Sequence, residues 1–294
     1  MKQLKNKVAA ITGAASGIGR MLAIRLAYEG SHLAISDIDE TGLMATKKMI
    51  GDHINISTHV ADVGIYEQVC RFAEEAVAYH GKVDLLINNA GVSLTDFLET
   101  VPLEDFKWLM DINFWGVVHG TMAFLPFLKR RPEGHIVNIS SISAMLPNPN
   151  NGPYCAAKSA VKGYTETLYQ ELMETNIHVS CVHPGGIKTN LGRNARVNRT
   201  LSDISKETAV ELCDKEVFIT TAEQAAKTII AGIKRNKRRI ITGIDAKVID
   251  ILTRLFPQTM ISLCAISSKR LAKKYADLQG ADRAIRPSSV HLPF

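Results

Sequence analysis

Tyr154 and Lys158 are the residues of this 294-residue chain whose types and spacing point most directly to chemistry. Positions i and i+4 of a helix share one face, so a helix here would bring the phenol and the ammonium to one reaction centre. A free tyrosine has a pKa near ~10, too high for a base at neutral pH. Since a neighbouring cation favours the phenolate, we predict that Lys158 lowers the pKa of Tyr154 and fits it for proton transfer.

Ser141 strengthens this hypothesis, because a tyrosine and a lysine at this spacing are common on ordinary helix surfaces. Ser141 lies 13 residues before Tyr154 and follows the apolar stretch 136–139, which is typical of a strand. The carboxyl ends of strands in an α/β sheet face the ligand crevice. A hydroxyl there can donate a hydrogen bond to a substrate carbonyl.

A glycine-rich segment near the start of the chain indicates a cofactor site. Residues 12–19 read TGAASGIG and stand between an apolar stretch and a helical pattern. Glycines allow a tight turn and a close approach to a pyrophosphate, and the following helix offers unpaired N–H groups and a partial positive charge. The strand before and the helix after are the context that a dinucleotide fingerprint requires.

Asp37 supplies the second element of that site. It lies 18 residues after Gly19, close to the ~20 expected for the acid that binds the adenosine ribose. Its charge would repel a 2′-phosphate, and neither Ala15 nor Ile38 offers a cation to bind one. We therefore predict NAD(H) in preference to NADP(H). The alternative role, the N-cap of the helix over 40–50, suits Asp39 better.

The order of apolar patterns predicts the fold that must position these residues. Strand-like and helical patterns alternate, which implies parallel strands with right-handed helical crossovers. We expect an α/β fold, a doubly wound, Rossmann-like parallel sheet in a single domain with a C-terminal helical extension. The expected strands are 7–12, 32–36, 54–60, 83–87, 136–139, 179–182 and 239–242, and the expected helices are 17–29, 40–50, 65–80, 102–129, 154–175 and 222–235.

Composition excludes several classes of protein. Hydrophobic residues make up 46% and charged residues 22%, which excludes disorder and collagen-like repeats. We find no stretch of the ~18 apolar residues of a membrane span and expect no secretion signal. Five cysteines without a Cys-x-x-Cys pair favour a reducing compartment, and no metal site is expected.

The positive charge of the chain is concentrated at its C-terminal end. Residues 231–294 contain 13 lysines and arginines against four aspartates, whereas the rest of the chain carries 22 basic and 25 acidic residues. We therefore divide the chain into a dinucleotide-binding catalytic domain, 1–245, and a basic, amphipathic extension, 246–294, which Pro257 interrupts. A solvated surface, an anionic membrane and a nucleic acid are the alternatives for such a tail, and the first is the default.

Taken together, these motifs resemble the short-chain dehydrogenase/reductase family over about residues 5–245. The resemblance rests on several motifs that occur in the order and at the spacing typical of that family. The matching segments are 12–19, Asp62-Val63, Asn88-Asn89-Ala90-Gly91, Asn113, Ser141, Tyr154 with Lys158, and Pro184-Gly185-Gly186-Ile187-Lys188-Thr189.

The resemblance implies a role for each residue. Tyr154 would exchange a proton with the substrate oxygen, and Ser141 would orient and polarise that oxygen. Lys158 would also hold the nicotinamide ribose, Asn113 would anchor a water in a proton relay, and Thr189 would help fix the carboxamide. The implied cofactor contacts are Gly13, Ser16, Gly17, Ile18, Gly19, Asp37, Asp62, Val63, Asn89, Ala90, Gly91, Tyr154, Lys158, Pro184, Gly185, Ile187 and Thr189. The implied substrate contacts are Ser141, Ser143, Leu146 and Tyr154.

The resemblance further implies that segments 93–98, 143–153 and 190–212 line the substrate cleft. Their apolar residues favour a lipophilic secondary alcohol, ketone or aldehyde. Two alternatives stay open. A 3-oxoacyl reductase of fatty-acid metabolism would usually prefer NADP(H) and lack the tail, and a non-catalytic NAD-binding redox sensor need not keep the proton relay.

The resemblance also implies a homodimer or homotetramer, and no nucleic-acid partner is expected. For the extension, packing on the domain, on a partner subunit or on a membrane surface remain alternatives. Apolar residues from Val248 to Leu263 lie between basic clusters, a composition typical of segments in a membrane interface. We expect a cytoplasmic protein, with peripheral membrane contact through the extension as one alternative.

Overall fold

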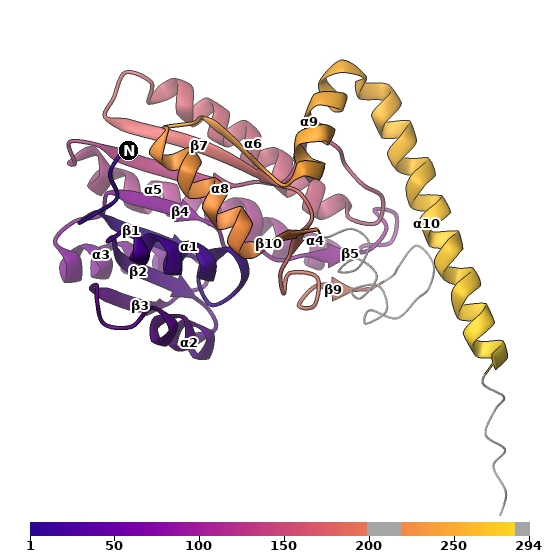
Figure 1. The fold of residues 1–294 in the computed structure, drawn as a ribbon, viewed down its shortest axis with the longest axis horizontal. Helices are drawn as coiled ribbons and strands as arrows, with labels where there is room; N and C mark the ends of the chain where they lie inside the picture. The colour runs from indigo at the N-terminus through magenta and orange to yellow at the C-terminus, as the bar shows by residue number, and fades with distance from the viewer. Residues whose placement is uncertain (199–218, 286–294) are drawn as a thin grey trace, which may run out of the picture.

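The computed structural model describes residues 1–198 and 219–285, and in the last helix it describes side chains only as far as Lys273. Its centre is a sheet of seven parallel strands in the order β11-β7-β6-β4-β1-β2-β3 (Figure 1). The strands are β1 (Val8–Thr12), β2 (His32–Asp37), β3 (Ile56–Val60), β4 (Leu85–Asn88), β6 (Gly134–Ile139), β7 (Ile177–Pro184) and β11 (Arg239–Thr242). The predicted doubly wound sheet is confirmed.

Helices cover both faces of this sheet. α1, α2 and α8 pack on one face and α3, α5 and α6 on the other. The α-helices are α1 (Gly17–Tyr28), α2 (Glu40–Ile50), α3 (Tyr66–His80), α4 (Leu103–Met110), α5 (Gly116–Lys129), α6 (Gly152–Glu171), α8 (Ala222–Lys234), α9 (Ile244–Leu255) and α10 (Pro257–Ile285).

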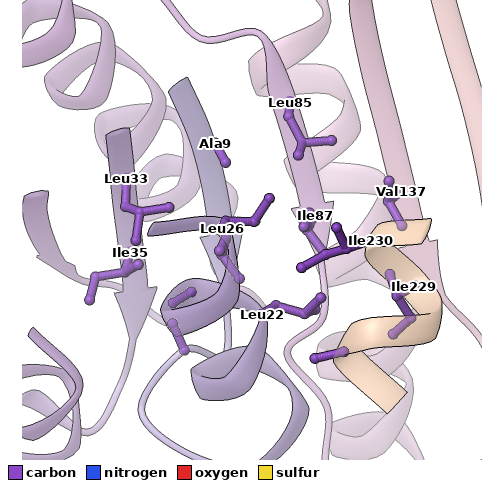
Figure 2. Close-up of a cluster of buried hydrophobic side chains, with 14 of the residues drawn as sticks. Ala9, Leu22, Leu26, Leu33, Ile35, Leu85, Ile87, Val137, Ile229 and Ile230 are labelled. Carbon is purple, nitrogen blue, oxygen red and sulfur yellow. The ribbon is translucent and has the colours of Figure 1, made fainter. Parts of the chain in front are cut away.

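The core follows from the alternation of side chains along the strands. In β1, Ala9 and Ile11 point toward α1, whereas Val8 and Ala10 point toward the opposite helical layer. Figure 2 shows the first cluster, where side chains of α1 and α8 meet those of the central strands. Strands buried on both faces are nearly continuously apolar, which is why short apolar runs located them in the sequence.

The chain reverses its direction across the sheet between β1 and β4. It runs from β1 outward to β3, then returns to β4 and proceeds to β6, β7 and β11. The carboxyl ends of β1 and β4 therefore border the crevice in which ligands of doubly wound sheets bind.

Local sequence signals fix several helix ends. Asp39 accepts a hydrogen bond of 2.9 Å from the backbone N–H of Gly42 and caps α2, as predicted. Thr221 and Gln224 form a reciprocal capping box at the start of α8. Pro153 stands in the first turn of α6, where its missing N–H costs no hydrogen bond.

One expected helix is wrong in detail. The pattern over 102–129 predicts a single helix, but the structure contains α4, a π-helical turn (Asp111–Trp115) and α5. A π-turn adds one residue to a helical turn, and the apolar periodicity does not reveal that insertion. Asn113 lies within this turn.

Two helices follow the last strand of the sheet. α9 ends at Leu255 and α10 begins at Pro257, as the proline predicts. Figure 1 shows α10 extending away from the sheet. Among the helices within the described ranges, none combines the length and the apolar character needed to span a membrane.

Candidate active site

The glycine turn between β1 and α1 has the backbone that only glycines adopt without strain. Gly13 has φ of 68° and Gly17 has φ of 54°. A Cβ on Gly19 would collide with the carbonyl oxygen of Gly13, and a Cβ on Gly13 would lie 2.7 Å from the Cα of Ala90. Ser16, the N-cap of α1, makes no side-chain cap. The first N–H groups of α1, which include that of Ile18, therefore remain for an anion, and this cradle fits the pyrophosphate of a dinucleotide.

The end of β4 holds this turn in place from behind. The side-chain amide of Asn89 donates hydrogen bonds of 3.0 Å to the carbonyls of Thr12 and Gly13. In return, the Thr12 hydroxyl accepts from the backbone N–H groups of Asn89 and Ala90, at 3.0 and 3.1 Å. The structure thus brings together the two predicted segments 12–19 and 88–91.

Asp37 lies at the end of β2, beside the turn. Its two carboxylate oxygens accept hydrogen bonds from the backbone N–H groups of Ala15, at 2.9 Å, and Asp39, at 3.1 Å. Sequence reasoning missed Arg20, whose guanidinium contacts the carbonyl of Ala15 and donates to Thr46 at 2.9 Å. The Arg20 guanidinium therefore lies near the Asp37 carboxylate, since both contact Ala15. Its hydrogen bonds are made to Ala15 and Thr46.

Asp62 and Val63 follow β3 at the same edge of the sheet. Asp62 accepts a hydrogen bond of 2.8 Å from the N–H of Gly64, and its own N–H donates to the Gln68 side chain. Val63 is buried, and a Cβ on Gly116 would lie 2.7 Å from its side chain. The small residue at 116 thus lets the π-turn and α5 approach this strand end closely.

Asn113 is fully buried and links the π-turn to the end of β4. Its side chain donates 2.9 Å to the carbonyl of Val92 and accepts 2.8 Å from the N–H of the same residue. A Cβ on Gly91 would lie 3.1 Å from the Asn113 oxygen and 3.5 Å from the ammonium nitrogen of Lys158. The side chain of Asn113 thus holds the backbone of Val92 against the π-turn.

Ser141, Tyr154 and Lys158 meet at the carboxyl end of β6. The hydroxyl of Ser141 lies close enough to the phenol of Tyr154 to act on its pKa. The Lys158 ammonium lies 5.7 Å from the centre of the Tyr154 ring and donates 3.0 Å to the carbonyl of Ile139. The helical spacing therefore places the two side chains on one face, as predicted.

The ionisation of this group differs from the sequence-based expectation. Burial raises the pKa of Tyr154 to about 12, and the hydrogen bond from Ser141 opposes that rise. Burial also lowers the pKa of Lys158 to about 8. The predicted lowering of the tyrosine pKa is therefore wrong for the protein's own groups, because the loss of hydration on burial raises it. Tyr154 carries its proton at neutral pH.

The segment after β7 closes the crevice from the other side. Thr189 lies over the glycine turn, since a Cβ on Gly17 would come within 3.4 Å of its side chain. Asp245 in α9, which sequence reasoning missed, accepts 2.7 Å from the N–H of Gly186 and packs against Gly185. Pro184 ends β7, and Ile187 is buried in the two-residue strand β8 (Ile187–Lys188), which pairs with β10 (Thr220–Thr221).

The three segments expected to line the substrate cleft are joined to one another. β5 (Leu94–Thr95), after β4, pairs with β9 (Arg196–Val197), after β7. The N–H of Asp96 donates 3.1 Å to the carbonyl of Asn150, which connects the first segment to the one after β6. Residues 199–212 of the third segment lie outside the described residues.

The segment after β6 lies directly before Tyr154. Ser143 donates its N–H to the Ser141 hydroxyl at 3.1 Å and its own hydroxyl to Asn148 at 3.5 Å. Leu146 is partly buried in the turn that follows. Ser140, not singled out from the sequence, is buried and donates 2.8 Å to the carbonyl of Lys158, so it fixes α6 against β6. The one feature of the sequence that could have identified Ser140 is its position directly before Ser141.

These residues gather away from the hollows found elsewhere on the surface. A hollow of about 250 Å³ includes Tyr169, His178 and Arg238 and lies near the opposite, amino-terminal ends of β6 and β7. Within the described ranges, no group of three His, Cys, Asp or Glu residues could hold a metal ion.

Comparison with known proteins places this geometry in context. The family model described as "short chain dehydrogenase" matches residues 7–200. The chain is 39% identical over 270 residues to the putative oxidoreductase SadH of Mycobacterium tuberculosis, which covers 90% of this chain and 96% of that protein. It is 38% identical over 192 residues to dehydrogenase/reductase SDR family member 4 of Bos taurus, 65% of this chain and 69% of that one.

Solved structures agree with this result. A short-chain dehydrogenase/reductase from Burkholderia phymatum in complex with NAD superposes with a TM-score of 0.78 at 30% identity, over 86% of this chain and 95% of that one. The 3-ketoacyl-(acyl-carrier-protein) reductase of Brucella melitensis complexed with NADH gives 0.70 at 27% identity, over 82% and 98%.

Proposed function

The chain belongs to the short-chain dehydrogenase/reductase family of oxidoreductases, and we propose that it transfers a hydride between NAD(H) and a secondary alcohol, ketone or aldehyde. The observation that carries the proposal is the meeting of Ser141, Tyr154 and Lys158 at the end of β6. A binding protein without turnover has no need of this proton-transferring set.

The chemistry assigned to the side chains follows from their hydrogen bonds. The Ser141 hydroxyl accepts from the N–H of Ser143, and its proton, which acts on Tyr154 in the free site, would turn to the substrate oxygen when a substrate binds. In the reducing direction Tyr154 gives its phenol proton to that oxygen as the C–H bond forms, and in oxidation it takes the proton back. A bound nicotinamide would supply or accept the hydride.

Lys158 and Asn113 support this proton transfer. Close to Tyr154, the lysine cation stabilises the phenolate that forms during reduction, and it is charged below its pKa of about 8. We assign the water of the relay to Asn113, whose side-chain amide keeps a second N–H and a second lone pair beside its two hydrogen bonds to Val92.

The choice of NAD(H) over NADP(H) is supported by Asp37. Its carboxylate is fixed by the N–H groups of Ala15 and Asp39 at the place expected for the adenosine ribose, where it would repel a 2′-phosphate. The nearby Arg20 is held by Ala15 and Thr46. We assign Asp62 and Val63 to the adenine side and Ile187 and Thr189 to the nicotinamide side.

A lipophilic substrate is supported by the residues beside the reaction centre. Leu94, Phe97, Met145 and Leu146 stand on the joined segments that border Tyr154, with the amide of Asn148 among them. An apolar cleft with few polar groups selects substrates by the apolar area it buries. We propose a substrate of medium or long chain length.

Two further assignments concern organisation. We propose residues 1–245 as the catalytic domain and 246–294 as its extension.

We also propose that two copies associate through the surface that carries Trp115, the last residue of the π-turn, and Met122 of α5, which are 47% and 54% exposed.

A substrate screen tests the reaction. Secondary alcohols and ketones of graded chain length, with aldehydes and 3-oxoacyl thioesters, are followed by NADH absorbance, with the Tyr154→Phe variant in parallel. We expect kcat/KM to rise with chain length and the variant to be inactive. Turnover confined to 3-oxoacyl thioesters would establish the fatty-acid alternative, and an absence of turnover with measurable NADH binding would favour the sensor.

A further inference from the structure

Helix α9 carries an apolar stripe on the side that faces away from the sheet. Ile244, Val248, Ile251 and Leu255 recur at intervals of three and four residues, so they lie on one helix face. They are 73%, 50%, 58% and 63% exposed. The α9 stripe, as we call these four residues, is thus presented to the outside along the whole helix.

The opposite face of α9 is attached to the domain through polar groups. Asp250 is 8% exposed and accepts hydrogen bonds from Arg239 of β11 and, at 3.1 Å, from Arg254. Asp245 binds the backbone of Gly186 at 2.7 Å. A surface helix normally buries its apolar stripe and exposes its polar side. In α9 these four apolar residues are exposed although Ala246 and Asp250 of the same helix are buried, and within the described residues nothing covers the stripe.

Further exposed apolar side chains lie at the junction between α9 and α10 and in α10. Phe256, at the junction, is 55% exposed, and Ile261, Leu263 and Ile266 of α10 are 50%, 49% and 47% exposed. Helix α10 then extends away from the sheet (Figure 1). Soluble monomers rarely expose this many large apolar side chains on two neighbouring helices.

The charged residues of this region favour one kind of partner. The lysines and arginines from 246 to 273 are exposed, namely Lys247, Arg254, Lys269, Arg270 and Lys273. The one acidic residue in that stretch of sequence is Asp250, whose carboxylate is paired. At 100° per residue, Lys247 and Arg254 lie beside the α9 stripe rather than behind it. Apart from Asp245, which binds the backbone of Gly186, the exposed charged residues near the stripe are therefore positive.

We propose that the α9 stripe, Phe256 and the first turns of α10 dock on an anionic lipid surface. The apolar side chains would enter the boundary between head groups and acyl chains while the cations pair with lipid phosphates and carboxylates. A second copy of the chain is a poorer partner, because a twofold contact would bring the same cations together. It would also need about 800 Å² per subunit, more than one stripe of four aliphatic residues supplies.

The docking surface adjoins the proposed substrate cleft. Cys264 of α10 lies 3.7 Å from the carbonyl of Pro147, and Arg239 donates 2.9 Å to the sulfur of Met145. Both contacted residues belong to the segment between Ser141 and Tyr154. Docking would therefore bring this segment close to the lipid, which suits the lipophilic substrate, and this last step rests on the proposed function.

Vesicle binding by the full chain tests the proposal. Sedimentation with vesicles of phosphatidylcholine containing phosphatidylglycerol is compared with sedimentation with phosphatidylcholine alone. We expect binding that requires the anionic lipid and weakens as salt is raised. The double variants Ile251→Ser with Leu255→Ser, and Lys247→Glu with Arg254→Glu, should each weaken partitioning at least about tenfold.

A matched control separates docking from general loss of surface apolarity. Tyr28→Ser with Met44→Ser removes two side chains that are 78% and 51% exposed on α1 and α2, and it should leave partitioning unchanged. Circular dichroism and thermal unfolding verify that every variant is folded. Wild-type protein that fails to bind the anionic vesicles overturns the proposal. So does a stripe variant that binds as well as wild type.

Binding of a second copy of the chain to the α9 stripe would give a different experimental result. Light scattering would then show a dimer that the stripe variant dissociates, without binding of either protein to vesicles, and this result overturns lipid docking. The vesicle assay involves no turnover. A protein that docks but is inactive would refute only the proposed reaction, and an active protein that does not dock would refute only this inference.

Discussion

The ammonium nitrogen of Lys158 lies 5.7 Å from the centre of the Tyr154 ring, and its hydrogen bond is donated to the carbonyl of Ile139 at the end of β6. The lysine is therefore fixed by the strand and not by the tyrosine it serves. Burial raises the pKa of the phenol to about 12, so the resting site holds a proton donor beside a cation. This combination suits the reduction of a carbonyl at neutral pH.

Tyr154→Phe should abolish turnover and leave the cofactor site intact. The ring and its packing are kept, but the transferable proton is lost, which we expect to reduce kcat by about 10²–10⁴-fold. NADH binding, followed by its fluorescence, should change by less than about twofold because the phenol is one of many contacts. Retained turnover would remove Tyr154 from its assigned role.

The two reaction directions should depend differently on pH. Reduction uses the protonated phenol, which is present at all pH values below about 12, so its rate should be flat through neutrality. Oxidation uses the phenolate, so its rate should rise with pH. Lys158 loses its charge as the pH passes its pKa of about 8, which lessens the stabilisation of the phenolate above that value.

Lys158→Met tests this assignment. Without the cation, the phenolate is harder to form, and the pH profile of kcat/KM for oxidation should move to higher pH by about one unit or more. The rate of reduction should remain independent of pH around pH 7, but it should be lower than in the wild-type protein. An unchanged oxidation profile would show that the lysine acts only on the ribose or on folding.

Asp37→Ala should relax cofactor preference. Removing the carboxylate removes the charge that repels a 2′-phosphate, and the ratio of kcat/KM for NAD to that for NADP should fall by about tenfold or more. Asp39→Ala is the control, because it removes the N-cap of α2 and costs about 1 kcal/mol of stability. The ribose assignment fails if both variants keep the wild-type preference.

Asp84 should be a main contributor to stability. It is fully buried at the start of β4, accepts 3.0 Å from the N–H of Val8 and 3.0 Å from the Arg131 guanidinium, and lies 3.7 Å from Lys82. Asp84→Ala leaves these groups unpaired, and we expect urea unfolding to show a loss of about 3 kcal/mol.

Glu166→Ala is the matched comparison for that variant. Glu166 pairs with Lys162 at 2.9 Å on the exposed surface of α6. A pair of this kind contributes about 0.3–0.5 kcal/mol, so its removal should barely move the urea midpoint. Equal effects of the two substitutions would contradict the role given to burial.

Local patterns in the sequence were enough to predict the sheet and much of the site. Buried parallel strands are short and apolar, so apolar runs located them. Asp39 is a typical N-cap residue and indicated the start of α2. Tyr154 and Lys158 are four residues apart, so helix geometry alone places them together.

The remaining features arise from contacts between distant segments. No local pattern shows that the Asn89 amide supports the glycine turn, that Asp245 binds Gly186, or that a π-turn contains Asn113. The pKa of Tyr154 was predicted in the wrong direction because the degree of burial depends on every segment that covers the side chain.

The pairing of β5 with β9 has a consequence for selectivity. These two short strands belong to the segments that follow β4 and β7, and the N–H of Asp96 donates a hydrogen bond to the carbonyl of Asn150 in the segment that follows β6. Within the described residues, these hydrogen bonds hold the segments against each other. We therefore expect substitutions that shorten the side chains of these segments to admit bulkier substrates.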